Sequence, residues 1–114
     1  DIYVVAEFSD KFVMAGAEYK LDLPEGVVML SSVSTDSVIV SLGRWDIDFM
    51  ITFRCIPGPK HWLVKYICKA TEDFNGGTVA TGKGSRQNFI DFPMCDATTT
   101  KVKGRPGTAV LTRQ

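Results

Sequence analysis

Apolar and polar residues alternate one by one over the middle of this chain. The clearest run covers residues 45–55, where the odd positions are apolar and the even positions are mostly polar. Successive side chains of a β-strand point to opposite faces, so the pattern predicts a long, half-buried strand. The side chains on its apolar face are Trp45, Ile47, Phe49, Ile51, Phe53 and Cys55.

A second, looser alternation follows at residues 61–68. The side chains on its apolar face are Trp62, Val64, Tyr66 and Cys68. Between the two runs lies Ile56–Lys60, which contains two prolines, and proline lacks the N–H donor that a strand ladder needs. We therefore expect the two runs to be neighbouring antiparallel strands in one sheet.

Further segments rich in β-branched and aromatic residues predict more strands. They are Ile2–Phe8, Glu18–Leu23, Val27–Val33, Ser37–Leu42, Phe89–Phe92 and Ala109–Thr112. Turn residues separate them at Pro24–Gly26, Thr35–Asp36, Gly43, Asn75–Gly77 and Gly104–Gly107. The one helical alternative is a helix of one or two turns over Lys69–Phe74. Short strands at this spacing predict an all-β sandwich.

The length of 114 residues suits a single domain. We expect residues 1–97 to form the body of the sandwich. Residues 98–114, which begin with Thr98–Thr100, are expected to be a threonine-rich exit and a final strand or linker of the same domain.

The net charge of zero conceals an uneven distribution. Up to Phe53 there are nine acidic and three basic residues, and after it there are ten basic and four acidic ones. A neutral chain is a poor general nucleic-acid binder, because such binders need surplus Lys and Arg. Folding can keep the two halves on separate surfaces or mix them, and only the first outcome gives a polarised surface. No apolar run has the roughly 20 residues that a membrane helix requires.

The sequence offers little catalytic chemistry. His61 is the only histidine, and Gly82–Arg86 lacks the spacing of a phosphate-binding loop. Asp46 and Asp48 are two apart on one strand face, and the distance between such carboxylates lies in the range of a glycosidase pair. Alternating aspartates are also common on the solvent-exposed face of an ordinary strand, and we favour that interpretation. Three dispersed cysteines and one histidine form no metal-ligand pattern. We expect no enzyme activity, no catalytic residues, no cofactor and no metal.

The cysteines indicate in which cellular compartment the protein is found. Cys55 and Cys68 fall at apolar positions of two strands expected to be adjacent, so a disulfide between them is sterically reasonable. Such a bridge would place the protein outside the reducing cytosol and leave Cys95 without a partner in the chain. The alternative is three buried thiols in an intracellular protein.

Taken together, these features resemble a known family. A β-sandwich of about 110 residues, with a cysteine pair on nearby strands and another cysteine near the end, is similar to ZP-N domains, the immunoglobulin-like modules of egg coats and other extracellular filaments. The strands carrying Phe53–Cys55 and Tyr66–Cys68 contribute to this resemblance. The family bridges its first cysteine to its fourth and its second to its third. That pattern implies that Cys55 pairs with Cys68 and that Cys95 is the fourth, while the first is missing here.

The resemblance implies an extracellular, non-enzymatic egg-coat recognition module, similar to repeats that the basic sperm protein lysin binds at fertilisation. The acidic half of the chain is compatible with such a partner. The candidate partner-binding residues are those on the polar face of the 45–55 strand: Asp46, Asp48, Met50 and Thr52. The alternative function is a structural, self-assembling subunit of a virion or secreted filament, with homotypic contacts.

Overall fold

The computed structural model describes residues 1–9, 12–96 and 101–112, and the predicted exit at Thr98–Thr100 lies outside them. The described residues form strands and loops and no helix. The strands are β1 (Ile2–Glu7), β2 (Val13–Asp22), β3 (Val27–Ser34), β4 (Val38–Arg44), β5 (Asp48–Pro57), β6 (Lys60–Ala70), β7 (Gly77–Gly82), β8 (Ile90–Pro93), β9 (Lys101–Gly104) and β10 (Thr108–Leu111). The all-β prediction is confirmed.

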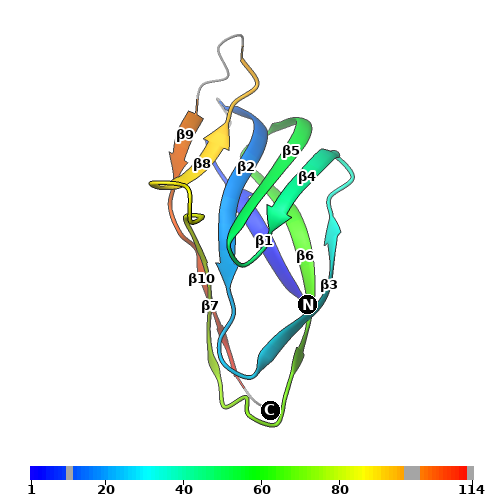
Figure 1. The fold of residues 1–114 in the computed structure, drawn as a ribbon. Helices are drawn as coiled ribbons and strands as arrows, with labels where there is room; N and C mark the ends of the chain where they lie inside the picture. The colour runs from blue at the N-terminus through cyan, green and yellow to red at the C-terminus, as the bar shows by residue number, and fades with distance from the viewer. Residues whose placement is uncertain (10–11, 97–100, 113–114) are drawn as a thin grey trace.

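The strands make two antiparallel sheets. The smaller has the order β1-β6-β3, and the larger has the order β10-β7-β2-β5-β4, with β8 paired to β2 and β9 to β8. In Figure 1, β1 and β6 lie behind β2, β5 and β4. Buried side chains from both sheets form one hydrophobic core, so the arrangement is sandwich-like.

The structure corrects several expected elements. β5 begins at Asp48, because Trp45–Ile47 form a turn closed by a hydrogen bond from Ile47 N to Arg44 O (3.1 Å). The helix over Lys69–Phe74 is wrong, since β6 continues to Ala70 and a turn follows. Gly43 lies within β4 and not in a turn. The strands β7 and β9 were not predicted.

The expected pairing of the two alternating runs is also wrong. β5 pairs with β2 and β4, whereas β6 pairs with β1 and β3. The short connection at Gly58–Pro59 therefore passes from one sheet to the other. Its backbone bonds to the loop after β1: Phe8 N donates to Pro59 O (2.8 Å), and Gly58 N donates to Phe12 O (3.4 Å).

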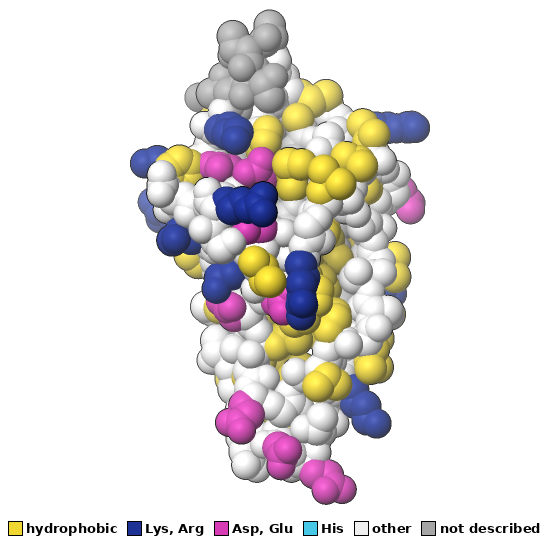
Figure 2. Space-filling view, viewed as in Figure 1, with side chains coloured by type: hydrophobic (Ala, Val, Ile, Leu, Met, Phe, Trp, Pro, Cys, Tyr) yellow, Lys and Arg dark blue, Asp and Glu magenta, His cyan; other side chains and the backbone are white. Residues whose placement is uncertain are grey.

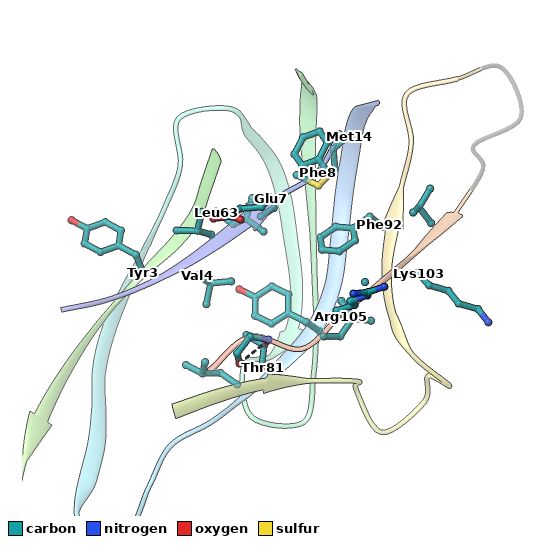
Figure 3. Close-up of a pocket in the computed structure, with 18 of the residues that line it drawn as sticks. Tyr3, Val4, Glu7, Phe8, Met14, Leu63, Thr81, Phe92, Lys103 and Arg105 are labelled. Atoms are coloured by element: carbon teal, nitrogen blue, oxygen red, sulfur yellow. Dashed lines mark hydrogen bonds between the residues drawn. The ribbon is translucent and has the colours of Figure 1, made fainter. Parts of the chain in front are cut away.

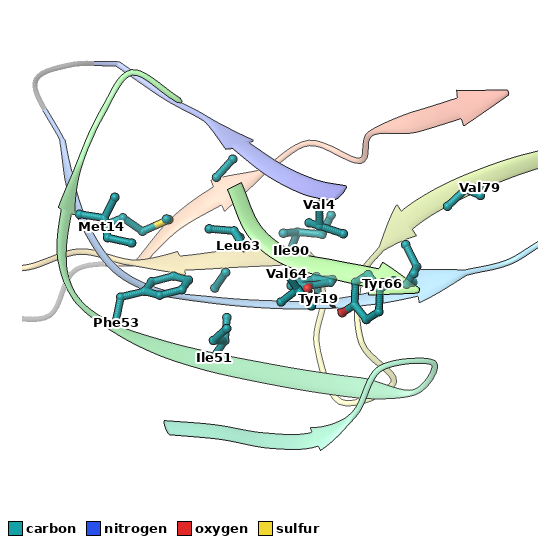
Figure 4. Close-up of a cluster of buried hydrophobic side chains, with 14 of the residues drawn as sticks. Val4, Met14, Tyr19, Ile51, Phe53, Leu63, Val64, Tyr66, Val79 and Ile90 are labelled. Atoms are coloured by element: carbon teal, nitrogen blue, oxygen red, sulfur yellow. Dashed lines mark hydrogen bonds between the residues drawn. The ribbon is translucent and has the colours of Figure 1, made fainter. Parts of the chain in front are cut away.

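The core joins the two sheets through one polar contact as well as apolar packing. The Tyr19 hydroxyl on β2 and the Tyr66 hydroxyl on β6 lie 2.8 Å apart, and both side chains are almost fully buried. Figure 4 shows them among Ile51, Leu63 and Val64. Burial raises the pKa of Tyr66 to about 12 and raises the pKa of Tyr19 further, because a phenolate is poorly solvated in the core.

The disulfide differs from the expected one. Cys55 is bonded to Cys95 with a Cα–Cα distance of 5.8 Å, and Cys68 is a free, half-buried thiol. The predicted Cys55–Cys68 bridge is therefore wrong, and the physical reason is that β5 and β6 belong to different sheets. Cys95 is positioned beside β2 by a hydrogen bond from its backbone N to Val13 O (2.8 Å). The bridge thus joins β5 to the segment after β8.

Candidate binding surface

The candidate residues Met50 and Thr52 lie on the outer face of β5. They alternate with Ile51 and Phe53, which are buried in the core. On one side, β4 places Leu42 opposite Met50 and Val40 opposite Thr52. On the other side, β2 places Glu18 and Gly16 opposite the same two residues. Met50 and Thr52 are half-buried, so they form the centre of a surface whose outer part belongs to the neighbouring strands.

Asp48 has an internal role in the fold. Ser85 Oγ and Arg86 N donate hydrogen bonds to its carboxylate, the latter over 3.1 Å, and Arg86 Nε lies 4.0 Å from it. The hydrogen bond from Ser85 lowers the pKa of the Asp48 carboxyl below its ordinary value. Gly84 makes this approach possible, since a Cβ there would clash with Asp48 Oδ1. The loop that follows β7, from Lys83 to Arg86, is fastened to β5 in this way.

Replacing Asp48 with alanine is expected to release this loop locally. Amide hydrogen exchange of Arg86 should accelerate by roughly tenfold, because its backbone N–H loses its acceptor. Asp46→Ala is the matched control, since its carboxylate pairs with Arg44 Nε (2.6 Å) outside the loop. Equal exchange of Arg86 in wild type and Asp48→Ala, measured by NMR, would show that the loop is held by something else.

A second polar cluster, which the sequence did not reveal, lies beside this surface. Gln87 Nε2 donates to Glu18 Oε2 (2.5 Å) and to Asp91 Oδ2 (3.4 Å), and Gly84 N donates to Gln87 Oε1 (3.0 Å). Lys101 Nζ lies 3.9 Å from Glu18 Oε1. The cluster ties the segment between β7 and β8 to β2. No sequence spacing signals it, because its members come from β2, β8, β9 and a loop.

The acidic and basic halves of the chain are mixed by the fold. β1 and β3 from the acidic half pair with β6, and β2 pairs with β7 and β8. Ion pairs between described residues also join the halves: Glu7–Lys60 (3.4 Å), Glu18–Lys101 (3.9 Å) and Asp48–Arg86 (4.0 Å). The sequence asymmetry therefore does not become two oppositely charged surfaces, and both Asp46 and Asp48 have basic neighbours.

The most unusual surface is apolar and was not predicted. β3 and β4 are the outermost strands on one side of the two sheets, joined by the turn at Asp36–Ser37. They expose Leu30 (61%), Ile39 (64%) and Leu42 (55%), together with Val28, Val33 and Val40. Asp36 is the only charged residue between positions 27 and 42. Figure 2 shows hydrophobic side chains gathered over the upper part of β4 and β5. The continuous apolar run at Val38–Val40 predicted a strand, but it did not predict that the strand would be exposed to solvent.

The remaining candidates form no recognisable centre. His61 Nδ1 lies 2.6 Å from the Trp62 carbonyl oxygen, within its own strand. In the described part of the chain, no group of three or more His, Cys, Asp or Glu side chains could hold a metal ion. Within the same residues there is also no helix with the length and hydropathy to cross a membrane.

No family model, no curated protein sequence and no solved structure matches this chain.

Proposed function

We propose that this chain is a non-enzymatic, extracellular protein-recognition module that binds its partner through the β3–β4 edge and the adjacent outer face of β5. The observation that carries the proposal is the exposure of Leu30, Ile39 and Leu42 on strands with almost no charge. Exposed apolar patches on a folded domain are characteristic of protein interfaces. Edge strands that avoid unwanted pairing usually carry charges, and the only charged residue in these two is Arg44, at the end of β4.

The extracellular location is supported by the Cys55–Cys95 disulfide. Stable disulfides in small domains belong to oxidising compartments. We propose further that the sandwich is immunoglobulin-like and of the ZP-N type, on the basis of the sequence resemblance. The Cys55–Cys95 disulfide departs from the second-to-third pairing of that family, so the cysteines no longer support the resemblance and only the strand pattern does.

Within this proposal the specific function is recognition on an egg coat, with the basic sperm protein lysin as partner. Apolar contacts at Met50, Leu42 and Val40 would supply most of the affinity, because Asp46 and Asp48 already have basic neighbours. A basic partner could still be attracted by the loops carrying Glu25, Glu72 and Asp73. These loops lie at the lower end of the molecule, where Figure 2 shows acidic side chains.

The test is binding of purified lysin to the wild-type chain and to the Leu42→Lys variant, by surface plasmon resonance. We expect the dissociation constant to rise at least about tenfold, because a central apolar contact of an interface is replaced by a charge. Val110→Lys, at a position that is 75% exposed on β10, is the control and should bind like wild type. Wild-type affinity of Leu42→Lys would refute the proposed surface.

The second candidate is a self-assembling structural subunit that uses the same edge. The specific observation in its favour is that β3 and β4 each have an unpaired side among the described residues and little charge to prevent association. Sedimentation velocity separates the two functions. A monomer that binds lysin supports recognition, whereas concentration-dependent oligomers abolished by Leu42→Lys support self-assembly.

A further inference from the structure

A cavity of about 870 Å³ opens between the two sheets on the side away from β3 and β4. One wall is β1, and the opposite wall is formed by β7, β8, β9 and β10. Met14, Tyr19 and Leu63 from the core contribute to its lining. Figure 3 shows β1 with Tyr3 and Val4 on one side and Phe92 and Arg105 on the other. The cavity is therefore an open, largely apolar groove.

The groove follows the edge of β1. Every residue from Ile2 to Glu7 lines it, although Val4 and Ala6 point into the core while Tyr3 and Val5 are exposed. Consecutive residues with opposite side-chain directions can line one cavity only along the edge of their strand. β1 pairs with β6 on its other edge and with no second strand among the described residues. Its outward N–H and C=O groups thus border the groove.

The opposite wall also ends in strand edges. In the described part of the chain β9 pairs only with β8, and β10 pairs only with β7. The smaller sheet has three strands facing a larger sheet, and Val79, Ile90 and Phe92 on β7 and β8 line the groove. Val79 and Ile90 are buried, whereas Phe92 is only half-buried. An additional strand beside β1 would pack against Phe92 and extend the smaller sheet.

The charge at the groove is basic. Arg105 and Lys103 line it, and Lys103 Nζ lies 4.7 Å from the centre of the Phe89 ring. Among the described residues of the lining Glu7 is the only acidic one, and it pairs with Lys60 (3.4 Å). Arg105 makes no ion pair with the described residues. Arg105 is exposed, and a carboxylate on the occupant could form a bidentate pair with its guanidinium.

We propose that this groove binds an extended segment of a partner protein, which pairs with β1 as a fourth strand of the smaller sheet. The segment has alternating apolar side chains that enter the groove and a carboxylate that pairs with Arg105. Main-chain hydrogen bonds to a free strand edge provide affinity in this mode, and side-chain pockets provide specificity. The groove lies away from the β3–β4 edge, so this binding site is independent of the proposed recognition surface.

The probe is an acetylated and amidated seven-residue peptide in which valine alternates with threonine and the last valine is replaced by glutamate, so that the carboxylate lies on the same face as the valines. In an NMR titration, we expect saturable shifts and slowed exchange of amides in β1. The same peptide with lysine for glutamate should bind roughly tenfold more weakly, because it loses the pair with Arg105. A version with every backbone nitrogen methylated should not bind, since neither of its edges can donate to the strand ladder.

Arg105→Glu should reverse the preference between the glutamate and lysine peptides, and Arg54→Glu, on β5, should leave it unchanged. Three results would overturn the proposal. Equal binding of the N-methylated peptide would indicate a simple apolar pocket. Shifts confined to β4 would place the peptide elsewhere. A peptide-independent dimer that protects the β1 amides would make a second copy the occupant.

Discussion

Replacing Cys95 with alanine is expected to lower the free energy of unfolding by about 4 kcal/mol. The Cys55–Cys95 bridge spans 40 residues of sequence, and chain-entropy estimates for a loop of that length give about this value. The bridge also ties β5 to the segment beside β2, so its loss frees two parts of the larger sheet. Guanidinium chloride denaturation of the oxidised wild type and of Cys95→Ala measures the difference.

Cys68→Ala is the matched control. Its thiol lies on β6, is half-buried, and has its pKa raised by burial, so it remains protonated and poorly nucleophilic near neutral pH. We expect a much smaller change in stability from this substitution than from Cys95→Ala. Non-reducing peptide mapping should find Cys55 linked to Cys95, with Cys68 open to alkylation after unfolding. A Cys68→Ala variant as unstable as Cys95→Ala would contradict the assigned pairing.

The disulfide also shows where sequence patterns stop being informative. Alternation identified β5 and β6 as half-buried strands, because burial of one face leaves a period of two in the sequence. It could not assign them to sheets, since a half-buried strand has the same pattern on either side of the core. The alternation is also interrupted: Met14 pairs with Ile56 and Gly16 with Thr52, so three residues of β5 lie opposite one of β2. Ile56 is consequently buried and Cys55 exposed.

The candidate surface was predictable to a similar extent. The alternation put Met50 and Thr52 opposite the buried Ile51 and Phe53, and they do lie on that outer face. The exposure of Ile39 and its neighbours in β4 could not be predicted, because a short apolar run is equally typical of a buried central strand. Position at the edge of a sheet depends on the pairing of distant segments. The internal bonds of Asp48 with Ser85 and Arg86 are hidden from the sequence for the same reason.

Removing one hydroxyl of the buried tyrosine pair should lower the free energy of unfolding, whereas removing both should leave it nearly unchanged. Tyr19→Phe leaves the Tyr66 hydroxyl in the core without its partner, and a buried unsatisfied hydroxyl costs about 1–3 kcal/mol. Tyr19→Phe with Tyr66→Phe removes both hydroxyls and keeps the ring volumes, so its stability at neutral pH should be close to that of wild type. Urea denaturation of wild type, the two single variants and the double variant measures the coupling energy between the two hydroxyls.

The same pair should make the fold sensitive to alkali. In the unfolded chain tyrosine ionises near its ordinary pKa of 10, whereas the folded-state pKa of Tyr66 is about 12. Above pH 10 the unfolded state therefore releases a proton that the folded state retains, and stability falls as the pH rises. The contribution is complete below pH 10, and the loss attributable to Tyr66 reaches about 2 kcal/mol by pH 12. The double phenylalanine variant should lose less stability between pH 9 and pH 12 than wild type, because other titrating groups are common to both. If the free energies of unfolding of the two proteins fell in parallel over this range, burial would not raise the pKa of the tyrosine hydroxyls.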